Sequence, residues 1–405
     1  MLNFFKKQIN LILLGVVLLL LYFNLISWQQ NWLGWILFFS YFYFTASFWQ
    51  DILRRVFGYK SKTKLLSVFA WFVIFLLLSF FAGVFLVFYK LTPVMIFSSY
   101  LMSALTSFFI CKKVGRKKCR ILDLDLIHEE KTEQVFKMNI ILPGIYLILW
   151  LLAILILWQS SASEVLFLPW QTISRYFLPI FFVLTFISGI FLFAKYKIKL
   201  VLLIFILQSI LIHTYLPFSH QNPWGGDVWR HMAVEERLST GGTVLPVLIG
   251  DEAKWVERVN VDVPEVFVSP NQYNYSQLWG GSVLLSQTLQ ISLTEINKWL
   301  IPFLWSIVSV FIFYRLGWLI FGSRRKGLWL AWLSFLPFSM QALGALSLPV
   351  SLGYLNFLFV LMLWLEYLYS RQKKQKRLVY LFASIMLFGY VLHFILIWLV
   401  ILCCF

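Results

Sequence analysis

Long apolar runs follow one another along the chain, separated by short polar or basic stretches. Each run has about 18 residues or more, which is enough to cross a bilayer core of roughly 30 Å as a helix. Because the runs show no alternation of apolar and polar positions, they predict membrane helices rather than barrel strands. The pattern predicts about eleven spans, at residues 9–27, 32–50, 65–89, 93–111, 139–158, 176–194, 198–216, 299–321, 328–347, 350–370 and 378–402.

These spans predict an all-α, polytopic integral membrane protein with one large loop, residues 217–298. We expect short amphipathic helices within that loop. The chain divides into an N-terminal six-span module, residues 1–196, and a membrane core, residues 197–405, that includes the loop. The last apolar run reaches Phe405 without a polar tail. We therefore expect the core to be truncated or to continue into further spans.

Composition agrees with the membrane interpretation. Apolar residues make up 61% of the chain and charged residues 13%, against about 45–50% and about 25% in soluble domains. The net charge of +17 would suggest nucleic acid for a soluble protein. Here the Lys and Arg residues lie in short clusters between apolar runs, which is a topology signal. We therefore predict the lipid bilayer as a partner and exclude nucleic acid.

The basic clusters also predict an orientation. Lys6 and Lys7 place the N-terminus in the cytoplasm. Alternation of the spans then puts every further basic cluster on the cytoplasmic side, at residues 54–64, 111–120, 195–199, 323–326 and 371–377. The loop 217–298, with nine acidic and five basic residues, falls outside. We expect the protein in the cell or plasma membrane with this loop external.

The start of the loop carries the strongest candidate chemistry. Pro223 and the following glycine pair predict a turn, and Asp227 is a good N-cap for a helix that ends at Gly241. Arg230 and His231 lie three and four residues after Asp227, so a helix presents all three on one face. This is either a capped helix with a local ion pair, or a carboxylate that binds a metal or accepts a proton beside phosphate-binding side chains.

Other ionisable residues extend the set of candidates. His220, Glu235, Asp251 and Glu252 join Arg230 and His231 as candidate substrate-binding residues. A solvated helix face is the alternative for the pair at 251–252. Cofactors are unknown from sequence, with a divalent metal at Asp227 as the candidate. Near the end of its span, Glu366 is interpreted as a side chain that extends to the membrane interface.

Residues 222–349 resemble the polyprenol-dependent GT-C glycosyltransferases, which include protein mannosyltransferases, aminoarabinose transferases and oligosaccharyltransferase catalytic subunits. Three segments carry the resemblance. The segment 225–231 (GGDVWRH) is similar to the acidic motif that opens the family's external loop. Residues 273–300 look like its re-entry segment, with an amphipathic helix before a span. Residues 315–338 look like a span that ends in Phe-Gly-basic-basic, followed by the next span.

The resemblance implies transfer of a sugar from a polyprenyl-phosphate-linked donor to an acceptor outside the cytoplasm. Asp227 would be the catalytic carboxylate, with Arg230 and His231 near the donor phosphate. In that superfamily the acidic loop follows the first span, whereas here it follows the seventh. Two other function classes stay open: a transporter or flippase, and a non-catalytic membrane assembly protein.

Overall fold

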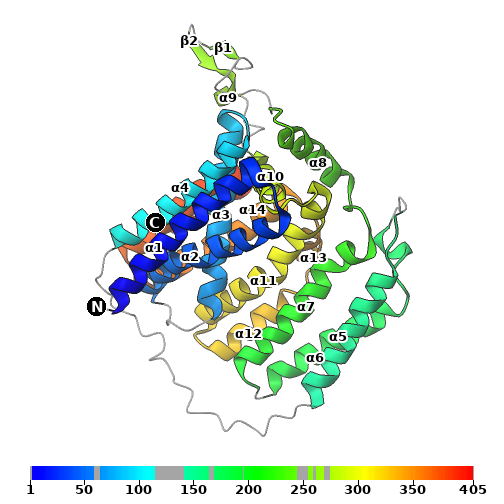
Figure 1. Ribbon diagram of the computed structural model, residues 1–405. Coiled ribbons are helices and arrows are strands. Elements are labelled where there is room, and N and C mark those ends of the chain that lie inside the picture. The colour runs from blue at the N-terminus through cyan, green and yellow to red at the C-terminus, as the bar shows by residue number, and fades with distance from the viewer. Residues whose placement is uncertain are drawn as a thin grey trace. The chain divides into compact units, whose positions relative to one another are not determined.

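The computed structural model describes residues 2–58, 64–114, 141–163, 168–194, 196–243, 254–258, 261–268 and 274–404. Helices dominate this part of the chain (Figure 1), and its strands form the short antiparallel hairpin of β1 (Trp255–Arg258) and β2 (Val261–Pro264). The chain forms two compact units that interleave in sequence. Unit 1 contains Met1–Arg120, Arg230–Ile296 and Gln372–Phe405, and unit 2 contains Ile121–Trp229 and Asn297–Arg371. The division of the membrane spans at residue 196 stays a prediction.

Unit 1 is built around four long helices that pack side by side (Figure 1). These are α1 (Leu2–Phe23), α2 (Asn31–Phe57), α3 (Lys64–Phe88) and α4 (Pro93–Val114), with a π-helical turn at Asn24–Trp28. The unit also holds most of α8 (Gly226–Ser239), together with α9 (Glu265–Val268), α10 (Ser276–Leu289), α15 (Lys373–Ile385), the 3₁₀ turn η4 (Met386–Phe388) and α16 (Val391–Cys403).

Unit 2 contains α5 (Ile141–Gln159), the 3₁₀ turn η2 (Pro169–Gln171), α6 (Phe177–Phe193), α7 (Ile198–Ser219), most of α11 (Leu293–Phe321), α12 (Arg324–Leu333), α13 (Phe338–Ala345) and α14 (Pro349–Ser370). Helices α5, α6 and α7 pack on one another. One buried side chain joins them: Gln208 accepts from the Tyr146 hydroxyl at 2.8 Å and donates to the Thr185 hydroxyl at 2.7 Å. The buried polar atoms of these three side chains are thereby paired.

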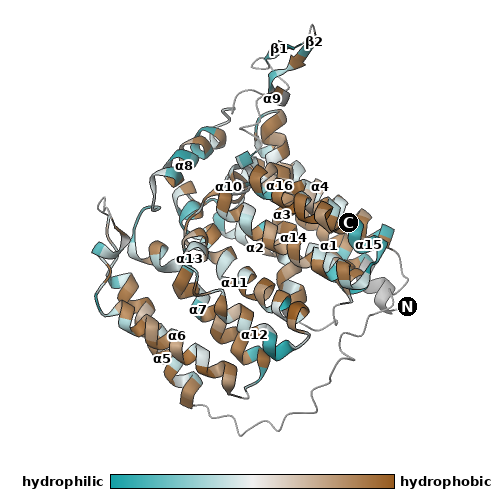
Figure 2. Ribbon diagram, turned by 180° about the vertical axis from the view of Figure 1, so that it is seen from behind, coloured by the Kyte–Doolittle hydropathy of each residue, from teal (hydrophilic) through white to brown (hydrophobic). Residues whose placement is uncertain are grey.

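Seven described helices are long and apolar enough to cross a membrane, which agrees with the predicted class. They are Gln8–Trp28, Leu65–Phe88, Pro93–Val114, Ile141–Gln159, Ile198–Ser219, Leu293–Phe321 and Pro349–Ser370. Large apolar side chains such as Ile148 and Phe186 are 67% and 71% exposed, and apolar residues run along the helices (Figure 2). Such a surface indicates a lipid bilayer around the protein. The full count of eleven spans stays a prediction.

Helix α10 differs from what its position in the predicted external loop suggests. It packs against α2 and α3 and is buried along almost its whole length. Glycines permit the approach, because a Cβ added to Gly280 would lie 2.6 Å from the backbone nitrogen of Gly83. The Gln277 amide donates to the Leu76 carbonyl at 3.2 Å. The segment expected to be an amphipathic helix is therefore a core helix of unit 1.

The predicted span 378–402 is a helical hairpin. Helices α15 and α16 are separated by η4, and the rings of Tyr380 and Trp398 lie 5.4 Å apart. In one straight helix these two residues would be about 27 Å apart. The chain therefore folds back at Met386–Tyr390, which explains why neither helix is as long as a bilayer requires.

The predicted span 328–347 is also interrupted. It consists of α12 and α13, with a break of four residues before Phe338 that contains Pro337. Proline cannot donate its backbone nitrogen and disfavours a helical residue before it, so the helix ends there. Both pieces contact α7. The two short helices replace the continuous span expected from the apolar pattern.

Glu366 does not extend to an interface as expected. Its carboxylate accepts from Arg315 Nε at 2.7 Å, and the two side chains are 4% and 7% exposed. The Arg315 guanidinium also lies 4.2 Å from the centre of the Trp318 ring. The sequence did not reveal this partner because it lies on α11, 51 residues away. Glu366 thus links α14 to α11 inside unit 2.

Candidate functional site

The predicted turn and helix at the start of the loop are present. Gly225 has a φ of 100°, α8 begins at Gly226, and Gly241, with a φ of 83°, follows its end. The helix starts two residues earlier than expected, so Asp227 lies in its first turn instead of capping it. The Gly242 amide donates to the Arg237 carbonyl and closes the C-terminal end.

Two short segments fix the chain that leads into α8. The Ala162 amide donates to the Ser219 carbonyl at 3.0 Å, and the Gln221 amide donates to the Ala162 carbonyl at 2.9 Å. His220 is held between these two bonds, at the end of α7, and its ring packs against Trp224 with centroids 4.6 Å apart and the planes tilted by 32°. This backbone clamp positions the turn at Pro223 and the first residues of α8.

The predicted site residues have different surroundings. Asp227 and Arg230 are exposed, whereas Glu235 is fully buried and His220 is 4% exposed. Asp251 and Glu252 lie outside the described residues. The boundary between the units falls within α8, after Trp229. Helix spacing keeps Asp227 one turn from Arg230 and His231, as expected, and the roles of all these residues stay predictions.

His231 is fixed by an aromatic neighbour in unit 1. The Trp279 indole donates to His231 Nδ1 at 3.2 Å, and the Tyr275 ring centre lies 5.1 Å from that of His231. A nitrogen that accepts cannot carry a proton, so the neutral ring holds its proton on Nε2. The Gln287 amide also donates to the Ser239 carbonyl, which ties the last turn of α8 to α10. His231 therefore positions α8 on α10.

A pocket lies beside the first turn of α8, within unit 2. It is a small hollow that is partly open to solvent. The end of α7, the turn before α8, the start of α11 and the segment before α14 line it. The side chains relevant to chemistry are Asn222, Trp224, Val228, Asn297, Lys298 and Ser347. Asp227 directly precedes Val228 along α8 but is not itself among the residues that line the pocket.

The pocket has a cationic character. Lys298 lines it, and burial together with the positive charge of Lys298 lowers the pKa of His220 below its ordinary value. His220 is therefore neutral at pH 7. Two buried polar atoms near the pocket, Ser347 Oγ and His220 Nε2, have no hydrogen-bond partner. A protonated lysine beside buried unpartnered polar atoms can bind an anion.

Sequence reasoning missed Asn297, Lys298 and Ser347. Two of them directly precede the apolar part of a span, where a polar residue is usually explained as an interface anchor. Ser347 precedes Pro349, the first residue of α14, and that pattern signals a helix start rather than a ligand. Their common location is a result of the fold, because three distant segments meet there.

A metal at Asp227 stays a prediction. Within the described ranges there is no group of three His, Cys, Asp or Glu residues arranged to hold a metal ion. Asp227 alone supplies too few protein ligands for a dedicated cage. A cation there would need oxygen atoms from a bound phosphate.

Comparison of the chain with protein-family models, curated proteins and solved structures finds no match. The resemblance to GT-C glycosyltransferases therefore rests on the three sequence segments, and function must be argued from the site.

Proposed function

We propose that the protein is a membrane glycosyltransferase that uses a lipid-phosphate-linked sugar donor, with Asp227 as its catalytic carboxylate. One observation carries the proposal: an exposed carboxylate lies in the first turn of α8, next to a cationic pocket at the ends of apolar helices. An amphipathic phosphate donor requires this combination, because its lipid tail needs the bilayer while its phosphate needs a cation.

The proposed reaction divides the work between the carboxylate and the pocket. Asp227 accepts the proton of the acceptor hydroxyl, whose oxygen forms a bond to the anomeric carbon of the sugar. The bond from that carbon to the phosphate oxygen breaks, and the lipid phosphate leaves with the electron pair. Positive charge in the pocket stabilises the phosphate that leaves.

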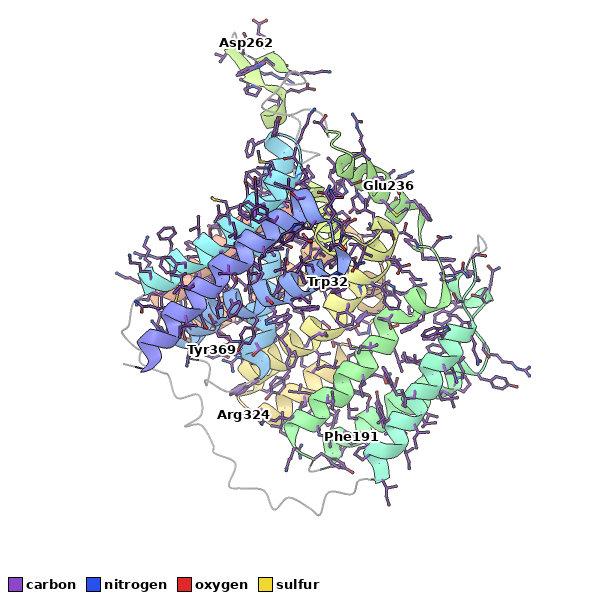
Figure 3. The ribbon with its side chains drawn as sticks, viewed as in Figure 1. Trp32, Phe191, Glu236, Asp262, Arg324 and Tyr369 are labelled. Carbon is purple, nitrogen blue, oxygen red and sulfur yellow. The ribbon has the colours of Figure 1, made fainter. Side chains whose placement is uncertain are left out.

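The first experiment is mass spectrometry of lipids that co-purify with the full chain, wild type beside Asp227→Asn. We expect a polyprenyl phosphate or its sugar conjugate on both, with the conjugate enriched on the variant because transfer stops. Glu236→Gln is the matched control, since Glu236 is an exposed carboxylate on the same helix (Figure 3). Unchanged sugar transfer by Asp227→Asn would refute the proposal.

Interrupted helices in unit 1 favour a transporter or flippase as the second candidate. The Ser276 hydroxyl, at the start of α10, donates to the Phe388 carbonyl at the tip of the α15–α16 hairpin. The Tyr275 and Tyr390 rings lie 6.4 Å apart at the same place. Short helices that meet in this way often form substrate sites of transporters. Translocation of a labelled lipid phosphate by reconstituted Asp227→Asn, at the wild-type rate, would favour this candidate.

A non-catalytic assembly protein is the remaining alternative. It predicts neither a bound lipid phosphate nor translocation, and co-purifying bulk phospholipid alone would support it.

A further inference from the structure

We infer that the pocket lined by Lys298 and Ser347 is a binding site for a phosphate group. The phosphate belongs either to a lipid headgroup or to a small ion free in solution, and the two sources share the same recognition chemistry. This inference rests on and deepens the proposed function, in which positive charge in the pocket stabilises the phosphate, whereas the sequence resemblance placed the phosphate near Arg230 and His231. It concerns binding alone and does not depend on the role of Asp227.

The charge of Lys298 is the first observation. Lys298 belongs to α11 and lines the pocket, with its ammonium 5.7 Å from the centre of the Trp299 ring. After burial, its positive charge is the second cause that lowers the pKa of His220. A lysine ammonium is a compact charge with three donors, which suits a phosphate oxygen.

The second observation is independent of that charge. Ser347 lines the same pocket, is 3% exposed, and its Oγ has no hydrogen-bond partner. Buried hydroxyl groups are nearly always hydrogen-bonded, so this unpartnered hydroxyl in the pocket lining can donate to a ligand that enters the pocket. A phosphate oxygen would accept from this hydroxyl.

Two helix N-termini add to the positive potential. Val228, in the first turn of α8, lines the pocket, and so does Ser347, two residues before the first residue of α14. These helices have 14 and 22 residues, so each directs the positive end of its dipole toward its first turn. Asp227 is the acidic side chain in the first turn of α8, and α14 has none there. Anions are bound at such helix starts in many proteins.

The side walls suit an amphipathic ligand. Leu216 and Pro217, at the end of the apolar helix α7, line the pocket together with Leu346. Apolar groups that continue from a membrane helix to the cation can contact the first carbons of a lipid tail while the phosphate reaches Lys298. Among the two sources, these walls favour the lipid monophosphate.

The test measures binding to the full chain in detergent by isothermal titration. The probes are farnesyl phosphate, inorganic phosphate and farnesol, which has the same tail without the charge. We expect farnesyl phosphate to bind and farnesol not to bind. Lys298→Gln should weaken the affinity for farnesyl phosphate by about tenfold or more, as expected for loss of one charge-assisted hydrogen bond. Ser347→Ala should weaken the same affinity by about threefold. Competition by inorganic phosphate alone at similar affinity would identify the free ion as the ligand.

Lys199→Gln is the matched control, because Lys199 is an exposed lysine of unit 2 at the other end of α7. It should bind like the wild type. Lys298→Arg keeps the charge and should retain most of the affinity, which separates loss of charge from loss of folding. Equal affinity of Lys298→Gln and wild type, or equal binding of farnesyl phosphate and farnesol, would overturn the inference. If the phosphate binds as expected but Asp227→Asn still transfers sugar, the proposed reaction fails and the binding site stands.

Discussion

Helix α10 in unit 1 and the α11–α14 pair in unit 2 are held in opposite ways. Gly280 on α10 meets Gly83 on α3 so closely that no side chain fits between the two backbones. Helices α11 and α14 are joined by the buried Arg315–Glu366 ion pair. Lipid offers no hydrophobic force to drive helices together, so they associate by close packing of small residues or by polar contacts. Each of these two contacts uses one of the two solutions, which predicts different sensitivities to substitution.

The ion pair should show the largest effect. Glu366→Ala leaves the Arg315 charge buried without its carboxylate, at an expected cost of about 3–5 kcal/mol in the free energy of unfolding. Chemical denaturation of the detergent-solubilised protein measures it. The double variant Arg315→Met with Glu366→Leu should recover much of the loss, since neither charge then remains. A single variant as stable as the wild type would show that the pair is solvated.

Close packing should give the next largest effect. Gly280→Ala places a methyl group where the Gly83 backbone lies, so α10 must move away from α3, at about 1–3 kcal/mol for overpacking. Gly15→Ala is the control in the same unit, because a Cβ there has nothing within 4 Å. Thermal unfolding distinguishes the two. Equal melting temperatures for both variants would mean that α10 is not tightly packed.

These two contacts also show what the sequence could predict. Spans such as 198–216 and 350–370 agree with α7 and α14, because a continuous apolar run has few alternatives in lipid. Helix α10 was placed in an external loop, since its glycines and polar residues lower its hydropathy, yet those glycines are what lets it pack in the core. The α15–α16 hairpin was missed because its turn at Gly389 lies within an unbroken apolar run.

The candidate site also has one part that the sequence could predict and one part that it could not. The helix with Asp227 could be predicted, because proline and glycine signals are local. The pocket could not, because Trp224, Lys298 and Ser347 come from three segments and each has an ordinary local explanation. Local signals predicted an element correctly but not which distant residues it meets.

The two units also differ in the surroundings of a histidine. His231 in unit 1 accepts a hydrogen bond from the Trp279 indole, whereas His220 in unit 2 is buried near a cation. Trp279→Phe removes the donor and should cost about 0.5–1.5 kcal/mol. Nitrogen NMR of labelled histidine should show that His231 loses its Nε2–H preference in the variant. An unchanged tautomer would mean that another group fixes the ring.

The smallest expected effect is the pH dependence from His220. Its folded-state pKa is lowered by burial and then by Lys298, so below pH of about 6.5 the unfolded chain binds a proton that the folded protein does not. Stability should therefore fall as the pH decreases through that value and level off below the folded-state pKa. Denaturation between pH 7.5 and pH 5 (roughly the range of histidine titration) measures this slope, and His220→Asn should reduce it.

A phosphate in the neighbouring pocket would offset the Lys298 charge and favour protonated His220, so bound farnesyl phosphate should also flatten the slope. A slope unaffected by both changes would mean that the titrating group lies elsewhere and that the pocket does not hold the anion near His220.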